Sequence, residues 1–106
     1  MQEKGLKMEK IVNEFNEKYM KSMRAEDRLL DIQSEIGELS KEILKATDYG
    51  TKDFEVTEDL ELELGDALYS LLSFAYENNI NAKEAVEKVV EKYTKRFASK
   101  GHIGSN

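Results

Sequence analysis

Two short segments of the chain share one pattern: an acidic residue, an aliphatic residue, glycine, a second acidic residue and a second aliphatic residue. They are Glu35-Ile36-Gly37-Glu38-Leu39 and Glu63-Leu64-Gly65-Asp66-Ala67. Each segment lies inside a longer run whose apolar residues have helical spacing. Acids three residues apart lie on one face of a helix, one turn above the other. The pattern therefore predicts two neighbouring helices that bring four carboxylates to one place.

Four carboxylates without a counter-ion would destabilise such a pair of helices. Two like charges about 4 Å apart repel by about 4 kcal/mol at an effective dielectric constant of about 20. A divalent cation removes this repulsion, and ligands that are all oxygen atoms suit Mg²⁺ or Mn²⁺. We therefore expect a Mg²⁺ site, in which Mn²⁺ can substitute. Its predicted ligands are Glu35, Glu38, Glu63 and Asp66.

The composition indicates a single, almost wholly helical domain over residues 1–106. The chain has no proline, tryptophan or cysteine, and glycine is scarce. The lack of cysteine excludes a disulfide framework and a thiolate metal site. The first residues open no apolar segment of the kind found in secretory signals, and no apolar run approaches membrane-spanning length. We expect a cytoplasmic protein with no membrane partner.

The charge is distributed unevenly along the chain. The net charge is −6, and twelve acidic but only three basic residues lie between Asp31 and Asp66. One interpretation is a solvated acidic surface. The other is a metal-dependent enzyme acting on phosphates, because the segment near the C-terminus is rich in lysine and arginine. The acidity argues against nucleic-acid binding.

Apolar spacing predicts four helices, over about residues 3–22, 25–46, 58–78 and 82–100. Thr57 and Asn81 are predicted N-caps of the third and fourth helices. Residues 47–56 form the longest loop and join the two acid-bearing helices. Tyr49 and Phe54 in this loop either contact a substrate or hold the loop to the body of the domain.

The third helix is apolar on nearly every side, which is typical of a helix buried on every side. Its predicted core stripe consists of Leu60, Leu64, Leu68, Leu71 and Ala75. The apolar residues outside this stripe are Leu62, Tyr69, Leu72 and Tyr76, and they have no other predicted cover. We therefore expect a homo-oligomer that associates through this helix. Gly37 and Gly65 are expected to permit close approach of helices.

The two acid pairs, separated by 24 residues, resemble the E-x-x-E…E-x-x-D signature of the MazG-type nucleoside triphosphate pyrophosphohydrolases. The resemblance runs from the first helix through Lys92-Tyr93-x-x-Arg96-Phe97. It implies an all-α, four-helix bundle-like domain that forms dimers or tetramers. It also implies Mg²⁺-dependent hydrolysis of a nucleoside triphosphate to a nucleoside monophosphate and pyrophosphate.

The resemblance also implies roles for individual residues. Glu35, Glu38, Glu63 and Asp66 match the acids that bind metal, and Glu35 with Glu38 are the implied catalytic residues. Glu35 matches the acid that holds or activates the attacking water. Lys92 and Arg96 match basic residues that contact substrate phosphates, and Ser105 lies in a C-terminal tail that resembles a phosphate-contacting element. Val89 and Val90 stand where many relatives carry an asparagine, which leaves recognition of the sugar or base open.

Two other classes of protein use similar helices. A carboxylate-bridged di-iron bundle needs Glu-x-x-His pairs, but the one histidine, His102, lies in the C-terminal tail. A non-enzymatic helical adaptor would explain the apolar third helix. It would leave the two matched acid pairs as a coincidence, and we retain it as the alternative to the enzyme.

Overall fold

The computed structural model describes residues 2–105, with side chains from residue 7 onward. Its four helices are α1 (Gln2–Tyr19), α2 (Ala25–Ala46), α3 (Glu58–Glu77) and α4 (Ala82–Lys100). The described residues contain no strand. The all-α fold with four helices is thus confirmed, and each helix lies within a few residues of its expected range. No helix in the described part of the chain is both long and apolar enough to cross a membrane.

Side chains at the helix ends explain where α3 and α4 begin. Thr57 Oγ1 accepts a hydrogen bond from the backbone N–H of Leu60 at 3.1 Å. Asn81 Oδ1 accepts one from the N–H of Glu84 at 2.9 Å. Both N-caps are confirmed, and each satisfies a backbone donor that the first turn of a helix leaves unpaired.

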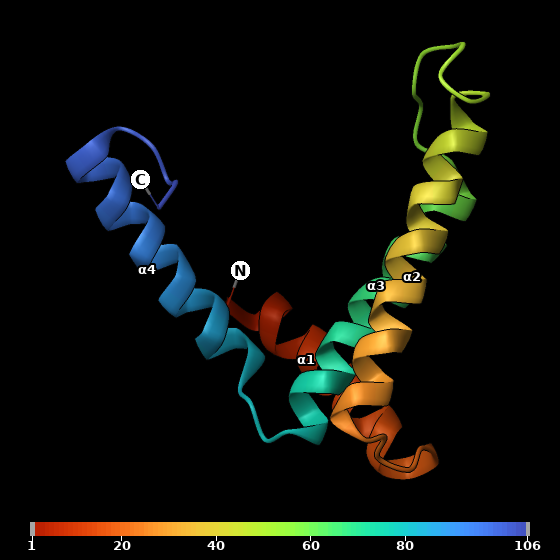
Figure 1. Cartoon of the computed structure of the whole chain (residues 1–106). Helices are drawn as coiled ribbons and strands as arrows, with labels where there is room; N and C mark the ends of the chain where they lie inside the picture. Colours follow the sequence, from red (N-terminus) through yellow and green to blue (C-terminus); the bar gives the residue numbers. More distant parts are fainter. Residues whose placement is uncertain (1, 106) are drawn as a thin grey trace.

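The helices α2 and α3 lie side by side as an antiparallel pair, which we call the hairpin (Figure 1). Helix α1 packs across α3 near the hairpin's base, which is the end where α2 begins and α3 ends. The Nδ2 of Asn16 donates to Ser73 Oγ at 2.9 Å, and the hydroxyl of Tyr69 donates to Asn16 Oδ1. The rings of Phe15 and Tyr69 meet edge to face, with centroids 5.9 Å apart. Tyr69 is therefore half-covered by its own chain, contrary to the expectation that it has no cover there.

Helix α4 diverges from the hairpin like the second arm of a V (Figure 1). One contact that holds its N-terminus is the N–H of Ala82, which donates to the carboxylate of Glu9 at 2.8 Å. No residue of α4 is buried. The apolar side of α4 is exposed and includes Val86, Val89, Val90, Tyr93 and Phe97. The radius of gyration is 16.6 Å, against about 13 Å for a compact domain of about 100 residues.

The hairpin also exposes apolar residues of both helices, with exposed fractions between 38% and 50%. We call this set the apolar face; its members are Leu29, Ile36, Ile43, Leu64, Leu68 and Leu71. The α2 members recur every seven residues, as in helices that pack along one another. Leu64, Leu68 and Leu71 were predicted to be core, and within one chain that prediction is wrong. The buried apolar residues of the described chain are Val12, Ile32, Leu60, Ala67 and Ala75.

The prediction that Gly37 and Gly65 permit close approach of helices is wrong within one chain. A Cβ atom placed on either glycine would meet no heavy atom within 4 Å. Neither glycine is therefore needed to bring α2 and α3 of one chain together.

Candidate metal centre

Three carboxylates from the two helices of the hairpin converge. Glu35 from α2, together with Glu63 and Asp66 from α3, each offer one carboxylate oxygen, and these oxygens lie within 4.8 Å of one another. Glu35 and Glu63 are half-buried, whereas Asp66 is exposed. We call these three residues the acid cluster. Three of the four predicted ligands are thus brought together by the pairing of α2 with α3.

The antiparallel register of the hairpin explains this convergence. Along α2, Asp31, Glu35 and Glu38 follow at helical spacing, and α3 runs past them in the opposite direction. Asp31 is hydrogen-bonded to Ser70, so one turn further along the hairpin Glu35 meets Asp66. Glu38 is exposed and is not among the three residues whose oxygens meet. By the same register it lies opposite Glu63, at the border of the cluster.

The crowding of negative charge shifts the pKa values of Glu35 and Glu63. Partial burial raises the pKa of Glu35, and the charges of its neighbours, foremost Asp66, raise it further. Desolvation likewise raises the pKa of Glu63, followed by the charges of Asp66 and Glu38. Both shifts mean that the ionised cluster is disfavoured in the folded chain unless a positive charge joins it. A divalent cation would supply that charge.

The donor set fits Mg²⁺ or Mn²⁺. All three cluster residues present carboxylate oxygens, which these hard cations prefer. The cluster faces solvent at Asp66, next to the exposed Glu38, and this side leaves room for water or a phosphate oxygen. Such a partial protein shell is usual for Mg²⁺, which keeps several waters and is often bound through one or two carboxylates and substrate phosphates.

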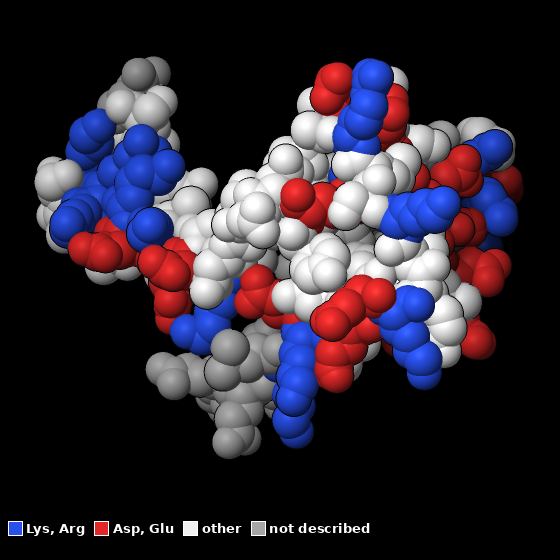
Figure 2. Space-filling view, turned by 90° about the horizontal axis from the view of Figure 1, so that it is seen from below, with Lys and Arg blue, Asp and Glu red and all other residues white. Residues whose placement is uncertain are grey.

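The predicted phosphate contacts lie on the other arm of the V. Lys92 and Arg96 belong to α4, and Figure 2 shows basic side chains gathered over that helix. The Nζ of Lys92 lies 5.5 Å from the centre of the Tyr93 ring. Arg96 donates to the carbonyl of Ile103 at 3.1 Å. A single chain does not bring these residues to the acid cluster.

The C-terminal tail folds back along α4. Lys100 Nζ donates to the carbonyl oxygen of Ser105 at 3.2 Å, and Ser105 is exposed. The turn begins at Gly101, whose φ of 77° is a left-handed conformation that favours glycine. Ser105 therefore lies beside the basic end of α4, on the same arm as Arg96.

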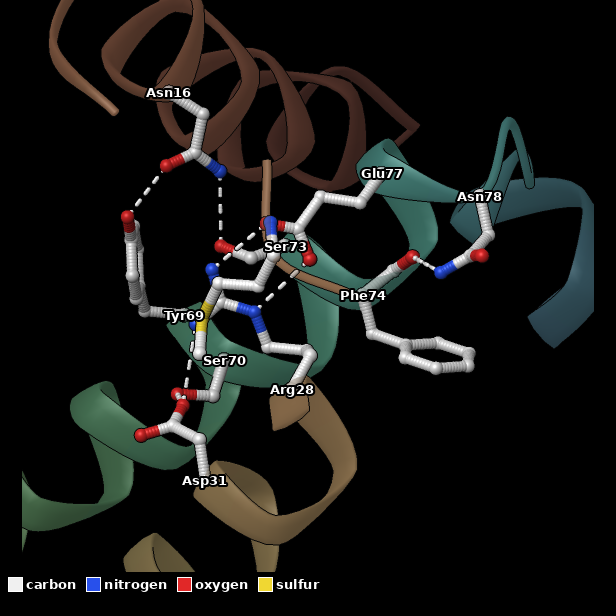
Figure 3. A network of polar contacts seen from close by, with 10 residues as sticks. Asn16, Arg28, Asp31, Tyr69, Ser70, Ser73, Phe74, Glu77 and Asn78 are labelled. Atoms are coloured by element: carbon white, nitrogen blue, oxygen red, sulfur yellow. Dashed lines mark hydrogen bonds and ion pairs between the residues drawn. The ribbon is translucent and has the colours of Figure 1, made fainter. Parts of the chain in front are cut away.

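Sequence reasoning missed a polar network beside the acid cluster (Figure 3). In it Arg28 pairs with Glu77 and Asp31, and Asp31 accepts a hydrogen bond from Ser70. A signal was present, because the polar stripe of α3 continues beyond Asp66 through Ser70 to Glu77. The pairing partner of that stripe, on another helix, is not visible in the sequence.

Comparisons with known proteins show the family of the chain. The MazG nucleotide pyrophosphohydrolase domain matches residues 23–99, a range that includes the acid cluster and most of α4. The uncharacterized protein YpjD of Bacillus subtilis (strain 168) is 32% identical over 92 residues, which cover 84% of this chain and 78% of that protein. No solved structure matches the chain significantly. The chain belongs to the MazG nucleotide pyrophosphohydrolase family.

Proposed function

We propose that this protein hydrolyses a nucleoside triphosphate to a nucleoside monophosphate and pyrophosphate, with Mg²⁺ as its cofactor. The observation that carries the proposal is the convergence of Glu35, Glu63 and Asp66 in a chain of the MazG family. An adaptor would gain nothing from three converging carboxylates, because their burial and crowding raise the pKa values of Glu35 and Glu63. The substrate class and the metal dependence are the parts that need experiment.

The residues of the hairpin have distinct tasks in this proposal. A bound divalent cation would offset the negative charge of the polyphosphate and polarise the oxygens at the reacting phosphorus. Glu63 and Asp66 hold the cation. Glu35 would contribute a ligand oxygen. As the resemblance to the family implies, it would also hold or activate the attacking water. Glu38, at the border of the cluster, completes the ligand set or assists Glu35.

We further propose that the active form is a homodimer or homotetramer. The apolar face and the exposed apolar side of α4 are both uncovered in a single chain. The seven-residue recurrence of Leu29, Ile36 and Ile43 suits packing against another pair of helices. A second copy is the simplest occupant, because symmetric pairing sets the same apolar face against itself.

A charge in the apolar face should break this association. We expect the parent to sediment as a dimer or tetramer at micromolar concentration, and Leu71→Lys to dissociate at least about tenfold more readily because a lysine would be buried. Leu62→Lys is the matched control. Leu62 was among the residues expected from the sequence to need cover by a second copy. It belongs to the same helix but is 63% exposed and lies outside the apolar face on which this proposal rests. A monomeric parent, or equal dissociation of the two variants, would contradict the proposed surface.

Association would also explain how α4 takes part in catalysis. Because α4 diverges from the hairpin of its own chain, we propose that Lys92 and Arg96 serve the acid cluster of a second copy. Arg96 would fork onto phosphate oxygens, Lys92 would act as a point charge, and the tail at Ser105 would lie beside them. The opposite charges of α4 and the hairpin favour such a contact.

Complementation between two inactive variants tests this arrangement. Asp66→Asn damages the acid cluster and Arg96→Ala damages the phosphate contact, so each homo-oligomer should be nearly inactive. After co-refolding of equal amounts, mixed dimers contain one site with both changes and one site with neither. Activity should then recover to about a quarter of the parental value in a randomly mixed dimer. A mixture no more active than its separate components would place Arg96 and the acid cluster in the same chain.

The proposed reaction is tested by pyrophosphate release. Purified protein is incubated with Mg²⁺ and each of a panel of canonical and modified nucleoside triphosphates, in parallel with samples containing EDTA. We expect Mg²⁺-dependent release of pyrophosphate from at least one member of the panel, and the rates will rank the bases and sugars. Mg²⁺-independent rates, or none across the panel, would favour the adaptor.

A further inference from the structure

The polar network beside the acid cluster contains one contact that joins the two helices next to the cluster. Ser70 Oγ of α3 donates to Asp31 Oδ2 of α2 at 2.8 Å. Arg28 Nη1 reaches the same Oδ2 atom at 3.2 Å. Ser70 is buried, and Asp31 is partly buried. Both hydrogen-bond donors to Asp31 are therefore buried side chains, and they hold its carboxylate in one orientation (Figure 3).

This contact lies one helical turn from the acid cluster on both helices. Asp31 precedes Glu35 by four residues, and Ser70 follows Asp66 by four residues. Residues four apart lie on one face of a helix. The Asp31–Ser70 hydrogen bond therefore links α2 to α3 one turn away from the point where Glu35 and Asp66 meet. It lies where repulsion among the cluster carboxylates would otherwise separate α2 from α3.

The contact also fixes the position of the negative charge of Asp31. Asp31 is close enough to Glu35 for its charge to act on that residue. Arg28 and Ser70 both bind Oδ2 of Asp31. These two contacts hold the charge of Asp31 in place, one helical turn from Glu35.

We infer that Ser70 and Asp31 are positioning residues for the metal centre, an inference that rests on the proposed function. Their hydrogen bond sets the register in which Glu35 faces Glu63 and Asp66. The folding of the hairpin has a separate anchor, because Arg28 forks onto Glu77 at 3.0 and 2.8 Å near the hairpin's base. Loss of the Ser70 hydroxyl should consequently affect metal affinity more than stability.

Mn²⁺ binding to the metal-free protein, followed by the EPR signal of free Mn²⁺, tests the inference without use of activity. Ser70→Ala should weaken Mn²⁺ binding about tenfold, the lower end of the loss seen when a group that orients a metal ligand is removed. Its melting temperature in EDTA should remain close to the parent's, because alanine favours helix. Ser70→Thr, which keeps the hydroxyl, should restore most of the affinity.

Ser73→Ala is the matched control. Ser73 is a buried serine on the same helix, but its hydroxyl accepts from Asn16 of α1 and does not contact α2 through any described hydrogen bond. Its substitution should leave Mn²⁺ affinity unchanged. If Ser70→Ala does not fold, Ser70→Cys provides the second variant, since a thiol keeps the volume but donates weakly.

Three results would overturn the inference, and they are distinguishable. Parental affinity in Ser70→Ala or Ser70→Cys would show that the register does not depend on this contact. An equal loss in Ser73→Ala would mean that any buried serine of α3 acts through general stability. A parent that binds no Mn²⁺ would refute the proposed function, and the positioning role with it.

Discussion

Glu35→Gln is expected to lower pyrophosphate release by about 100-fold or more, because it removes a metal ligand and the proposed base together. The same substitution should leave the metal-free protein at least as stable as the parent. The pKa of Glu35 is raised in the folded chain, so the folded state binds its proton more tightly than the unfolded state does. The contribution of Glu35 to stability therefore falls as pH rises from the unfolded pKa through the folded one. At neutral pH a neutral glutamine avoids that loss.

Steady-state pyrophosphate release and thermal unfolding in EDTA measure the two halves of this prediction. Asp66→Asn and Glu38→Gln extend the series, with Glu38→Gln expected to be the milder because Glu38 lies outside the three converging carboxylates. Glu17→Gln is the charge-matched control, since Glu17 is an exposed acid on α1. Near-parental turnover in Glu35→Gln and Asp66→Asn would mean that the acid cluster is a solvated surface.

Arg28→Met is expected to destabilise the protein by about 3–5 kcal/mol, which is typical when one partner of a buried ion pair is removed. The side chains of Arg28 and Glu77 are only 5% and 4% exposed, and two hydrogen bonds join them. The substitution leaves the carboxylate of Glu77 buried with a backbone N–H, that of Met23, as its remaining described donor. The melting temperature should fall by roughly 12 °C or more.

Arg24→Met is the control for Arg28→Met. Arg24 also pairs with two acids, but its side chain is 72% exposed. Exposed pairs contribute about 0–1 kcal/mol, so this variant should unfold close to the parent. The double variant Arg28→Met/Glu77→Leu should recover much of the loss, because neither buried charge of the pair remains. Equal melting temperatures for the two arginine variants would contradict the assigned role of the buried pair.

The Arg28–Glu77 pair also predicts how the stability of the protein changes at acidic pH. Hydrogen bonding from Arg28 lowers the pKa of Glu77 below its ordinary value. The stability from this pair is therefore fully present above the unfolded pKa and is lost as pH falls through the folded pKa. Urea unfolding at a series of acidic pH values should show that loss in the parent. In Arg28→Met the free energy of unfolding should fall less with decreasing pH than it does in the parent. An unchanged pH dependence would argue against this pair as the source of the acid effect.

The helices and the acid cluster were predictable because both depend on local spacing. Thr57 and Asn81 marked helix starts through side-chain chemistry that acts within three residues. Acids three residues apart on two helices joined by one loop needed only antiparallel pairing to meet. Three of the four predicted ligands meet in this way.

The partner of each apolar stripe was not predictable. Periodicity shows that Leu64, Leu68 and Leu71 form a face, but it contains no information on whether the same chain or another copy covers it. Tyr69 illustrates the converse, because α1 covers it through Asn16 and Phe15, more than fifty residues away in sequence. The residues of the Arg28–Glu77 pair lie 49 positions apart in sequence. Such contacts follow from the packing of helices and not from any one helix.

The most direct test of the account is a Mn²⁺ titration of the parent and of the double variant Glu35→Gln/Asp66→Asn, with free Mn²⁺ followed by EPR. A second double variant, Glu14→Gln/Glu17→Gln, removes the same charge from exposed positions on α1. The account predicts saturable binding by the parent, nearly unchanged binding by the α1 variant, and loss of binding in the cluster variant. No binding by the parent, or equal binding by all three proteins, would contradict it.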